Sequence, residues 1–191
     1  MRVEKTKLDG LLVLHPQVFG DDRGWFMESF NQQRFEAALK ALNLPIPTLF
    51  VQDNHSCSQK GVLRGLHFQR EPYAQGKLVR VVQGKVWDVA VDIRPNSKTY
   101  GEWVGVELSA ENKTMFWIPE GFAHGFIALE HNTQFLYKTT NYYNKESEGA
   151  IIWNDPMLAI EWPLNRVGEV VVSEKDLKAT KFSNISACNL K

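Results

Sequence analysis

One segment near the start of the chain has the hydrophobic periodicity of an amphipathic helix. Over residues 32–42 the apolar side chains recur at i, i+3, i+4 and i+7, namely at Phe35, Ala38, Leu39 and Leu42. This spacing places them in a single stripe along a helix surface. An asparagine and a proline follow within three residues, and both favour the end of a helix. The pattern predicts a helix over residues 32–42.

Most of the remaining chain alternates in the manner of short β-strands separated by turn residues. Residues 77–82 and 86–93 are rich in β-branched side chains and flank a turn at 83–85 with a central glycine, so they predict a β-hairpin. Further strands are predicted at residues 102–108, 114–118, 125–128, 133–140 and 150–153. Many short strands at this spacing are typical of a mostly β sandwich or closed barrel.

A short helix is predicted near the end of the chain, over residues 173–178. Ser173 has the side chain of an N-cap, and Asp176 stands three residues later, where a capping box has its acidic partner. On this interpretation the carboxylate of Asp176 serves only to cap the helix.

Composition narrows the class of protein. The chain has 191 residues, 43% of them hydrophobic and 23% charged, as expected for one globular domain spanning residues 1–191. The formal net charge is zero, so there is no overall electrostatic reason to expect nucleic acid or an anionic membrane as a partner. A pocket for one phosphorylated ligand needs only a few Lys or Arg side chains and stays compatible with this charge.

The sequence also suggests where the protein works. No apolar stretch is long enough to span a membrane, and the first residues lack the apolar core of a signal peptide. The two cysteines, Cys57 and Cys188, form no CxxC pair, which argues against cysteine zinc sites and thiol redox chemistry. We therefore expect a cytoplasmic protein with reduced thiols.

A first polar cluster interrupts the strand pattern at residues 61–69. Strict alternation places His67 on one face with Leu63, Gly65 and Gln69. The other face then carries Arg64, Leu66 and Phe68. A glycine on the face of His67 leaves room beside the ring for another group. The common alternative for a single histidine is a hydrogen-bonded core residue.

A second cluster, at residues 118–126, resembles half of the cupin signature. Pro119, Gly121 and His124 have the P-x-G-x-x-H spacing of that signature. A cupin is a small jelly-roll barrel with its ligand site in the mouth. Metal-binding cupins add three further ligands from an earlier motif, which here offers only His67. Since imidazoles without a clustered carboxylate make a poor metal site, the sequence predicts no metal.

A third cluster contains Tyr137. Alternation puts it on one strand face with Phe135 and Thr139, and a tyrosine inside a barrel needs a partner for its hydroxyl. Simple filling of the barrel is an equally good interpretation of Tyr137 from the residues alone.

Taken together, these clusters resemble the dTDP-4-dehydrorhamnose 3,5-epimerase family. The matching stretches occur in order along nearly the whole chain, at residues 18–24, 51–56, 62–69, 74–80, 88–94, 118–126, 137–138, 153–156 and 173–176. The resemblance implies a cupin-type jelly-roll β-barrel with a few short peripheral helices. It also implies an enzyme without a cofactor that inverts C3 and C5 of dTDP-4-dehydro-6-deoxy-D-glucose, the step before dTDP-L-rhamnose.

The resemblance implies a role for each member of a catalytic set. His67 is the general base, Asp176 orients and stabilises its ring, and Tyr137 is the acid on the opposite face of the sugar. Lys77 is the cation beside the C4 oxygen, where negative charge develops. From the residues alone Lys77 is equally compatible with an exposed strand lysine, and Asp176 with a helix cap.

The same resemblance implies a set of substrate contacts. These are Arg23, Phe26, Glu28, Gln52, Asn54, Arg64, His124, Tyr143, Glu148 and Lys175. The two arginines suit a pyrophosphate, Phe26 lines the site, and Tyr143 stacks on the base, with Tyr142 as the alternative. His124 is also compatible with a core histidine that closes the barrel mouth. Members of the family are homodimers in which the N-terminal segment, with Arg23, crosses to the partner's site.

Two alternatives stay open. One is a mono-epimerase of a related nucleotide 4-keto sugar, acting at C3 or C5 only. Another is a nucleotide-sugar-binding cupin without turnover, which would not need a base, an acid and a lysine together. A metal-dependent cupin or a 3,4-ketoisomerase fits the histidines less well.

Overall fold

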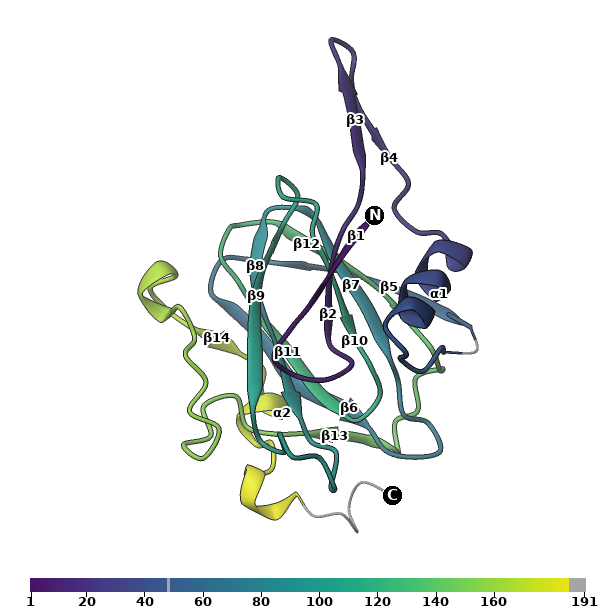
Figure 1. Ribbon diagram of the computed structural model, residues 1–191. Helices are drawn as coiled ribbons and strands as arrows, with labels where there is room; N and C mark the ends of the chain where they lie inside the picture. Colours follow the sequence, from purple (N-terminus) through teal and green to yellow (C-terminus); the bar gives the residue numbers. More distant parts are fainter. Residues whose placement is uncertain (48, 186–191) are drawn as a thin grey trace.

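The chain folds mainly into two β-sheets that face each other (Figure 1). The computed structural model describes residues 1–47 and 49–185. The first sheet runs in the order β1 (Arg2–Lys5), β2 (Leu12–His15), β10 (Met115–Ile118), β7 (Lys77–Gln83), β12 (Thr133–Thr139) and β5 (Gln52–Ser58). The second runs β13 (Glu148–Ala150), β6 (Val62–Gln69), β11 (Phe122–Ala128), β8 (Lys85–Asp92) and β9 (Trp103–Ser109). A mostly β jelly roll with short peripheral helices is therefore confirmed.

The other elements lie around these two sheets. They are the two-stranded ribbon β3 (Val18–Asp21) and β4 (Gly24–Met27), the helices α1 (Gln32–Ala41) and α2 (Glu174–Leu177), the strand β14 (Val171–Val172), and the short 3-10 helices η1 (Leu164–Arg166) and η2 (Phe182–Asn184). β14 pairs in parallel with the start of β6. Within the described residues no helix is long and apolar enough to cross a membrane.

Helix α1 forms where the periodicity predicts it and covers the outer face of the six-stranded sheet. Asn31 caps its first turn, because its side chain accepts a hydrogen bond from the Arg34 N–H at 3.1 Å. Phe35 and Leu39 are fully buried and pack against the outer side chains of the sheet, among them Leu78. Burying two such side chains contributes about 3–6 kcal/mol in transfer free energy.

A mainly apolar core lies between the two sheets. Alternate side chains of the strands meet there, from both sheets: Val79, Val81, Val86, Ala90, Phe116, Phe122, Phe126 and Phe135. These are the inward positions of β7, β8, β10, β11 and β12, as expected for a strand period of two. At one end of this interior the inward side chains become polar.

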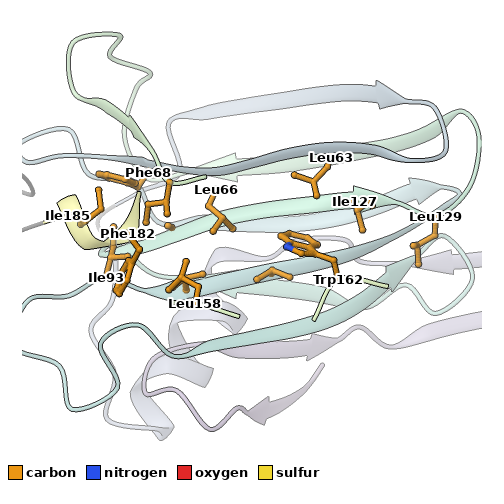
Figure 2. Close-up of a cluster of buried hydrophobic side chains, with 14 residues drawn as sticks. Leu63, Leu66, Phe68, Ile93, Ile127, Leu129, Leu158, Trp162, Phe182 and Ile185 are labelled. Carbon is orange, nitrogen blue, oxygen red and sulfur yellow. The ribbon is translucent and has the colours of Figure 1, made fainter. Parts of the chain in front are cut away.

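The chain after β13 covers the outer face of the five-stranded sheet. Figure 2 shows the sheet residues Leu63, Leu66 and Phe68 facing Trp162 and Phe182 of this covering segment. The predicted strand at 150–153 is wrong by a few residues, because β13 ends at Ala150. The indole N–H of Trp162 donates to the Trp153 carbonyl at 2.9 Å, so this region is held as irregular structure.

The predicted hairpin around residues 83–85 is wrong. β7 lies between β10 and β12 in one sheet, whereas β8 lies between β11 and β9 in the other. Both strands carry apolar residues on both faces, so each is buried as an inner strand of its own sheet. The turn at Gly84 (φ 75°) passes the chain from one sheet to the other, and a Cβ there would lie 2.4 Å from Thr133 Oγ1.

The ribbon of β3 and β4 forms an arm that projects away from both sheets (Figure 1). Phe19 and Phe26 are opposite each other across the two strands and are 56% and 69% exposed. Trp25, on the other face, is 59% exposed and lies under the ammonium of Lys113 at 4.4 Å. Exposed aromatic side chains gathered on a protruding ribbon are typical of a surface that another protein covers.

Of the two cysteines predicted to be reduced, the structure describes one. Cys57 is an exposed free thiol on β5, in the residues that the structure describes. Cys188 lies outside the described residues.

Candidate active site

Strand β6 carries an irregularity that decides which side chains enter the site. His124 of β11 is opposite His67, whereas Phe126 is opposite Arg64, so β6 contains one extra residue between these pairs. Gly65 (φ 120°) lies in this bulge, where a Cβ would be 2.6 Å from the Gly125 Cα.

Because of the bulge, some side chains of β6 lie on a different face from the one that strict alternation predicts. Leu63, Leu66 and Phe68 all belong to the outer apolar cluster, and Arg64 shares the inner face with His67. The predictions that Arg64 points away from His67 and that Leu63 shares its face are both wrong. An inserted residue reverses the alternation, since side chains change face at every step along a strand.

His67 is held by a carboxylate from the far end of the chain. Its Nε2 lies 2.6 Å from Asp176 Oδ1, and the other oxygen, Oδ2, accepts a hydrogen bond from the Gly65 N–H at 3.4 Å. Asp176 is 3% exposed. Burial opposes its ionisation, but the hydrogen bond and charge of His67 outweigh that effect and hold the pKa of Asp176 below its usual value. Asp176 is therefore an anion that fixes the orientation of the His67 ring.

The predicted capping of α2 is confirmed for the backbone. Ser173 is the N-cap, and its hydroxyl accepts a hydrogen bond from the Asp176 N–H at 3.1 Å. The carboxylate of Asp176 does not complete a capping box, because it bonds to His67 and Gly65 instead. The helix cap thus holds Asp176 in place while its side chain serves the histidine.

Lys77 opens β7 and points into the interior. It is 9% exposed, so the alternative of an exposed strand lysine is wrong. Burial lowers the pKa of Lys77 to about 8, with Asp88 and Glu148 opposing the shift through their negative charges. At neutral pH the side chain therefore stays mainly a cation, surrounded by low-dielectric protein.

Tyr137 lies on β12, in the sheet opposite His67. It is beside Val79 of β7 and Asn54 of β5, and its ring packs against Phe135 with centroids 6.1 Å apart. Burial raises the pKa of Tyr137, although the nearby positive charge of Arg64 acts in the other direction. Its phenol is therefore protonated at neutral pH and faces the interior.

A second histidine–aspartate pair lies next to the first. His124 Nε2 is 2.9 and 3.0 Å from the two carboxylate oxygens of Asp88, and Asp88 is fully buried. The ring of His124 also stacks on Phe135 at 6.1 Å. Burial lowers the pKa of His124 and raises that of Asp88. Sequence reasoning missed Asp88; the one available signal was an acidic residue flanked on both sides by the apolar residues of this strand.

The remaining polar residues form a rim around this interior. Glu148 bonds to the Lys175 ammonium at 2.6 Å and accepts a hydrogen bond from the Tyr143 hydroxyl at 3.0 Å. Gln52 accepts a hydrogen bond from the Tyr143 N–H at 3.1 Å and donates to Asn54 at 3.0 Å. These contacts bring together five residues that the resemblance implies as substrate contacts. Tyr143 is the member of the tyrosine pair whose hydroxyl is bonded to this rim.

Two arginines were expected at the pyrophosphate, and they lie in different places. Arg64 is on the inner face of β6 and donates to the Ser58 hydroxyl at 3.1 Å. Arg23 is at the tip of the arm, where it pairs with Asp21. Phe26 is on the arm as well, and Glu28, at its base, pairs with Arg34 of α1 at 3.1 Å. In the described part of the chain, the partners of Arg23 and Glu28 are Asp21, Asn31 and Arg34, and none of these belongs to the polar interior around His67.

Potential metal ligands are scattered over the described part of the chain. No group of three or more His, Cys, Asp or Glu side chains there is arranged to hold a metal ion.

The fold and the site define an acid–base enzyme built on a two-sheet jelly roll. A family model described as dTDP-4-dehydrorhamnose 3,5-epimerase matches residues 5–184. Among curated relatives, dTDP-4-dehydrorhamnose 3,5-epimerase of Shigella flexneri is 57% identical over 95% of this chain and 96% of its own length. That of Salmonella typhimurium is 58% identical over 94% of each chain.

The same family appears among solved structures. A 3,5-epimerase of Legionella pneumophila, solved in complex with dTDP-4-keto-L-rhamnose, is 51% identical to this chain. Its TM-score is 0.92, over 99% of this chain and 96% of that one. The chain belongs to the dTDP-4-dehydrorhamnose 3,5-epimerase family. The sequence-based predictions of this family and of an isomerase acting on a carbohydrate are confirmed.

Proposed function

We propose that this epimerase inverts C3 and C5 of dTDP-4-dehydro-6-deoxy-D-glucose with His67 as base and Tyr137 as acid, giving dTDP-4-dehydro-L-rhamnose. The observation that carries these roles is the short contact between His67 and Asp176, made opposite a partly buried tyrosine, Tyr137, from the other sheet. Both target carbons flank the C4 ketone, so the substrate itself accepts the electrons released when either C–H bond breaks.

His67 has the tautomer that a base needs. Because the Asp176 carboxylate only accepts hydrogen bonds, Nε2 of His67 carries the proton and Nδ1 keeps the lone pair. Nδ1 makes no hydrogen bond within the described residues and is free to accept a proton from carbon. When it does so, the Asp176 anion stabilises the imidazolium.

Lys77 supports the intermediate. The electrons of the broken C–H bond move to the C4 oxygen, which becomes an enolate, and a buried ammonium stabilises such a charge strongly. Lys77 supplies that cation from β7, on the side of the interior where Tyr137 also lies.

Tyr137 completes the inversion. Because it belongs to the sheet opposite His67, its hydroxyl delivers a proton to the other face of the enolate carbon. Each inversion leaves a proton on His67 and removes one from Tyr137. Exchange of both groups with solvent restores them before the second carbon reacts, so each inverted carbon receives a proton that comes from water.

We further propose that the substrate is the dTDP-linked sugar and that two copies of the chain share each site. Arg23 and Phe26 lie on an arm that leaves their own subunit, and three of its aromatic side chains are more than half exposed. A partner's rim, with Arg64, Tyr143 and Lys175, would receive Arg23 from the arm as a further phosphate-binding arginine. We also propose that the enzyme works in the cytoplasm.

The test follows the sugar by NMR in deuterated water with the purified protein and dTDP-4-dehydro-6-deoxyglucose. Deuterium at both C3 and C5, with the L-configured product trapped by a reductase, supports the double epimerase. Deuterium at one carbon alone makes the protein a mono-epimerase. Binding without exchange at either carbon overturns the roles of His67 and Tyr137.

A further inference from the structure

Asp88 is a fully buried carboxylate to which the proposed mechanism gives no role. It lies on the inner face of β8, and both of its oxygens bond to Nε2 of His124, at 2.9 and 3.0 Å. His124 in turn is opposite His67 across β11 and β6. A buried anion costs several kcal/mol unless it is paired, so its presence beside the site calls for a function.

Two charged side chains act on Asp88, one from its own sheet and one from the opposite sheet. Asp88 faces His124 of β11 and Lys77 of β7, and Lys77 also faces Glu148 of β13. His124 faces both Lys77 and His67. Glu148 is partly exposed and already engaged by the Lys175 ammonium at 2.6 Å. Burial raises the pKa of Asp88, whereas the charge and hydrogen bond of His124 and the charge of Lys77 act in the other direction. Asp88 is therefore the fully buried carboxylate that Lys77 and His124 share.

The geometry points to Asp88 as a positioning residue of this enzyme: its two oxygens hold the His124 ring through Nε2, which turns Nδ1 the other way, and they place a buried carboxylate beside the Lys77 ammonium. This inference rests on the proposed function, since it concerns the cation that stabilises the enolate. Nδ1 of His124 has no hydrogen-bond partner among the described residues, as expected for a nitrogen that faces the substrate. The single carboxylate of Asp88 thus fixes the direction of His124 Nδ1 and supplies the negative charge beside the Lys77 ammonium. Both of these groups face the substrate.

Removing the charge of Asp88 should shift the pH dependence of the rate to lower pH. Lys77 has a pKa of about 8 with the Asp88 anion beside it. Removing that charge lowers the pKa of Lys77 further, because the desolvation that favours the neutral amine is unchanged. A decrease of about one unit would leave roughly a tenth of Lys77 charged at pH 8 instead of half, and the rate there would fall about fivefold more than at pH 6.

The experiment compares the pH–rate profiles of the wild type and Asp88→Asn, an isosteric change that removes the charge. We expect the alkaline limb of kcat to move to lower pH by about one unit and KM to change little. The matched control is Asp92→Asn, on the same strand, whose buried carboxylate accepts hydrogen bonds from Arg94, Ser97 and Thr99. That change should lower the melting temperature and leave the alkaline limb where it is.

An unchanged alkaline limb in folded Asp88→Asn overturns the inference. If this variant does not fold, NMR of labelled lysine and aspartate in the wild type decides the question. A Lys77 titration near pH 8 that is also sensed by the Asp88 carboxyl supports the inference, and the absence of that step at Asp88 overturns it. Failure of the proposed function is distinguishable, because the wild type itself would then show no exchange at C3 or C5.

Discussion

The imidazole of His67 and the carboxylate of Asp176 lie 2.6 Å apart, although 109 positions separate them in the sequence. The first is on an inner strand of the five-stranded sheet and the second on a one-turn helix near the end of the chain. The parallel pairing of β14 with β6 brings the two together, since β14 ends one residue before the N-cap of α2. Docking of the C-terminal segment therefore completes the His67–Asp176 pair.

Removing the charge of Asp176 should disable the base without unfolding the protein. In Asp176→Asn the amide no longer demands a proton on Nε2 of His67, so the ring loses the required tautomer and its imidazolium loses its counterion. We expect kcat to fall by about 10²–10⁴-fold, as for other histidine bases that lose their carboxylate. Steady-state kinetics with a coupled reductase measures the effect.

The matched control is Asp155→Asn. Asp155 is also a buried carboxylate that accepts hydrogen bonds from backbone N–H groups, those of Met157 and Phe182, but it lies outside the site. This variant should be less stable and keep its kcat. A full kcat in Asp176→Asn would remove Asp176 from the mechanism.

Tyr137→Phe should separate exchange from inversion. His67 can still remove the C–H proton and return one from solvent to the same face, whereas the opposite face has lost its acid. We expect deuterium to enter the sugar with retention of configuration and the rate of inversion to fall about 10²–10⁴-fold. NMR of the recovered sugar distinguishes the two outcomes.

Tyr100→Phe provides the comparison for that experiment. The Tyr100 hydroxyl donates to the Ile185 carbonyl at 3.0 Å, away from the site, so its loss should leave inversion unchanged. Inversion at the normal rate in Tyr137→Phe would assign the acid to another group.

The activity should fall as the pH rises through about 8, because Lys77 loses its proton there. In Lys77→Arg the cation persists at all accessible pH values, so the alkaline limb due to this group should disappear even if the rate at neutral pH is lower. A limb at the same pH in Lys77→Arg would assign it to a different group.

Loss of the Lys77 proton should lower the activity of the protein but raise its free energy of unfolding. The pKa of Lys77 is about 8 in the folded protein and about 10.5 in the unfolded chain. Between these values the unfolded state binds more protons, so the contribution of Lys77 makes the free energy of unfolding rise with pH, by up to about 1.4 kcal/mol per pH unit. That contribution is fully present above the unfolded value and is lost as the pH falls through 8. Urea titrations of the wild type and Lys77→Arg, compared across this window, isolate it.

Mixing two inactive variants should restore activity if the arm of one subunit serves the site of the other. Arg23→Ala and His67→Asn each disable a homodimer, but a mixed dimer has one site with both Arg23 and His67. Random pairing of equal amounts then restores about a quarter of the wild-type activity, since half of the dimers are mixed and one of their two sites is intact. Coupled assays after unfolding and refolding the mixture together measure the recovery.

Two results would contradict the shared site. The first is a mixture that forms mixed dimers, as seen by native mass spectrometry, but recovers no activity. That result would place the Arg23 and His67 of one site in the same chain. The second is full activity of a monomer at high dilution.

The elements that could be predicted from the sequence are those set by neighbours within a few residues. The stripe of Phe35 and Leu39 predicted α1, and Ser173 predicted the start of α2, because helix periodicity and capping depend on residues three or four apart. Alternation placed Phe135 and Tyr137 on one face of β12 for the same reason. The resemblance, in turn, supplied the roles of His67 and Lys77, which alternation and composition do not carry.

Other features were decided by the tertiary structure, because they depend on which distant strands pair. The Gly84 turn joins two sheets instead of forming a hairpin, since β7 and β8 each bury both faces among different partners. The bulge at Gly65 turns Arg64 toward His67, and its position is defined only by the register against β11. The burial of Lys77, the Asp88–His124 pair and the contact of His67 with Asp176 all join side chains whose separation along the chain carries no local signal. Local periodicity thus determined the kinds of element in this protein, whereas long-range pairing and burial decided which polar side chains meet and how strongly their charges are felt.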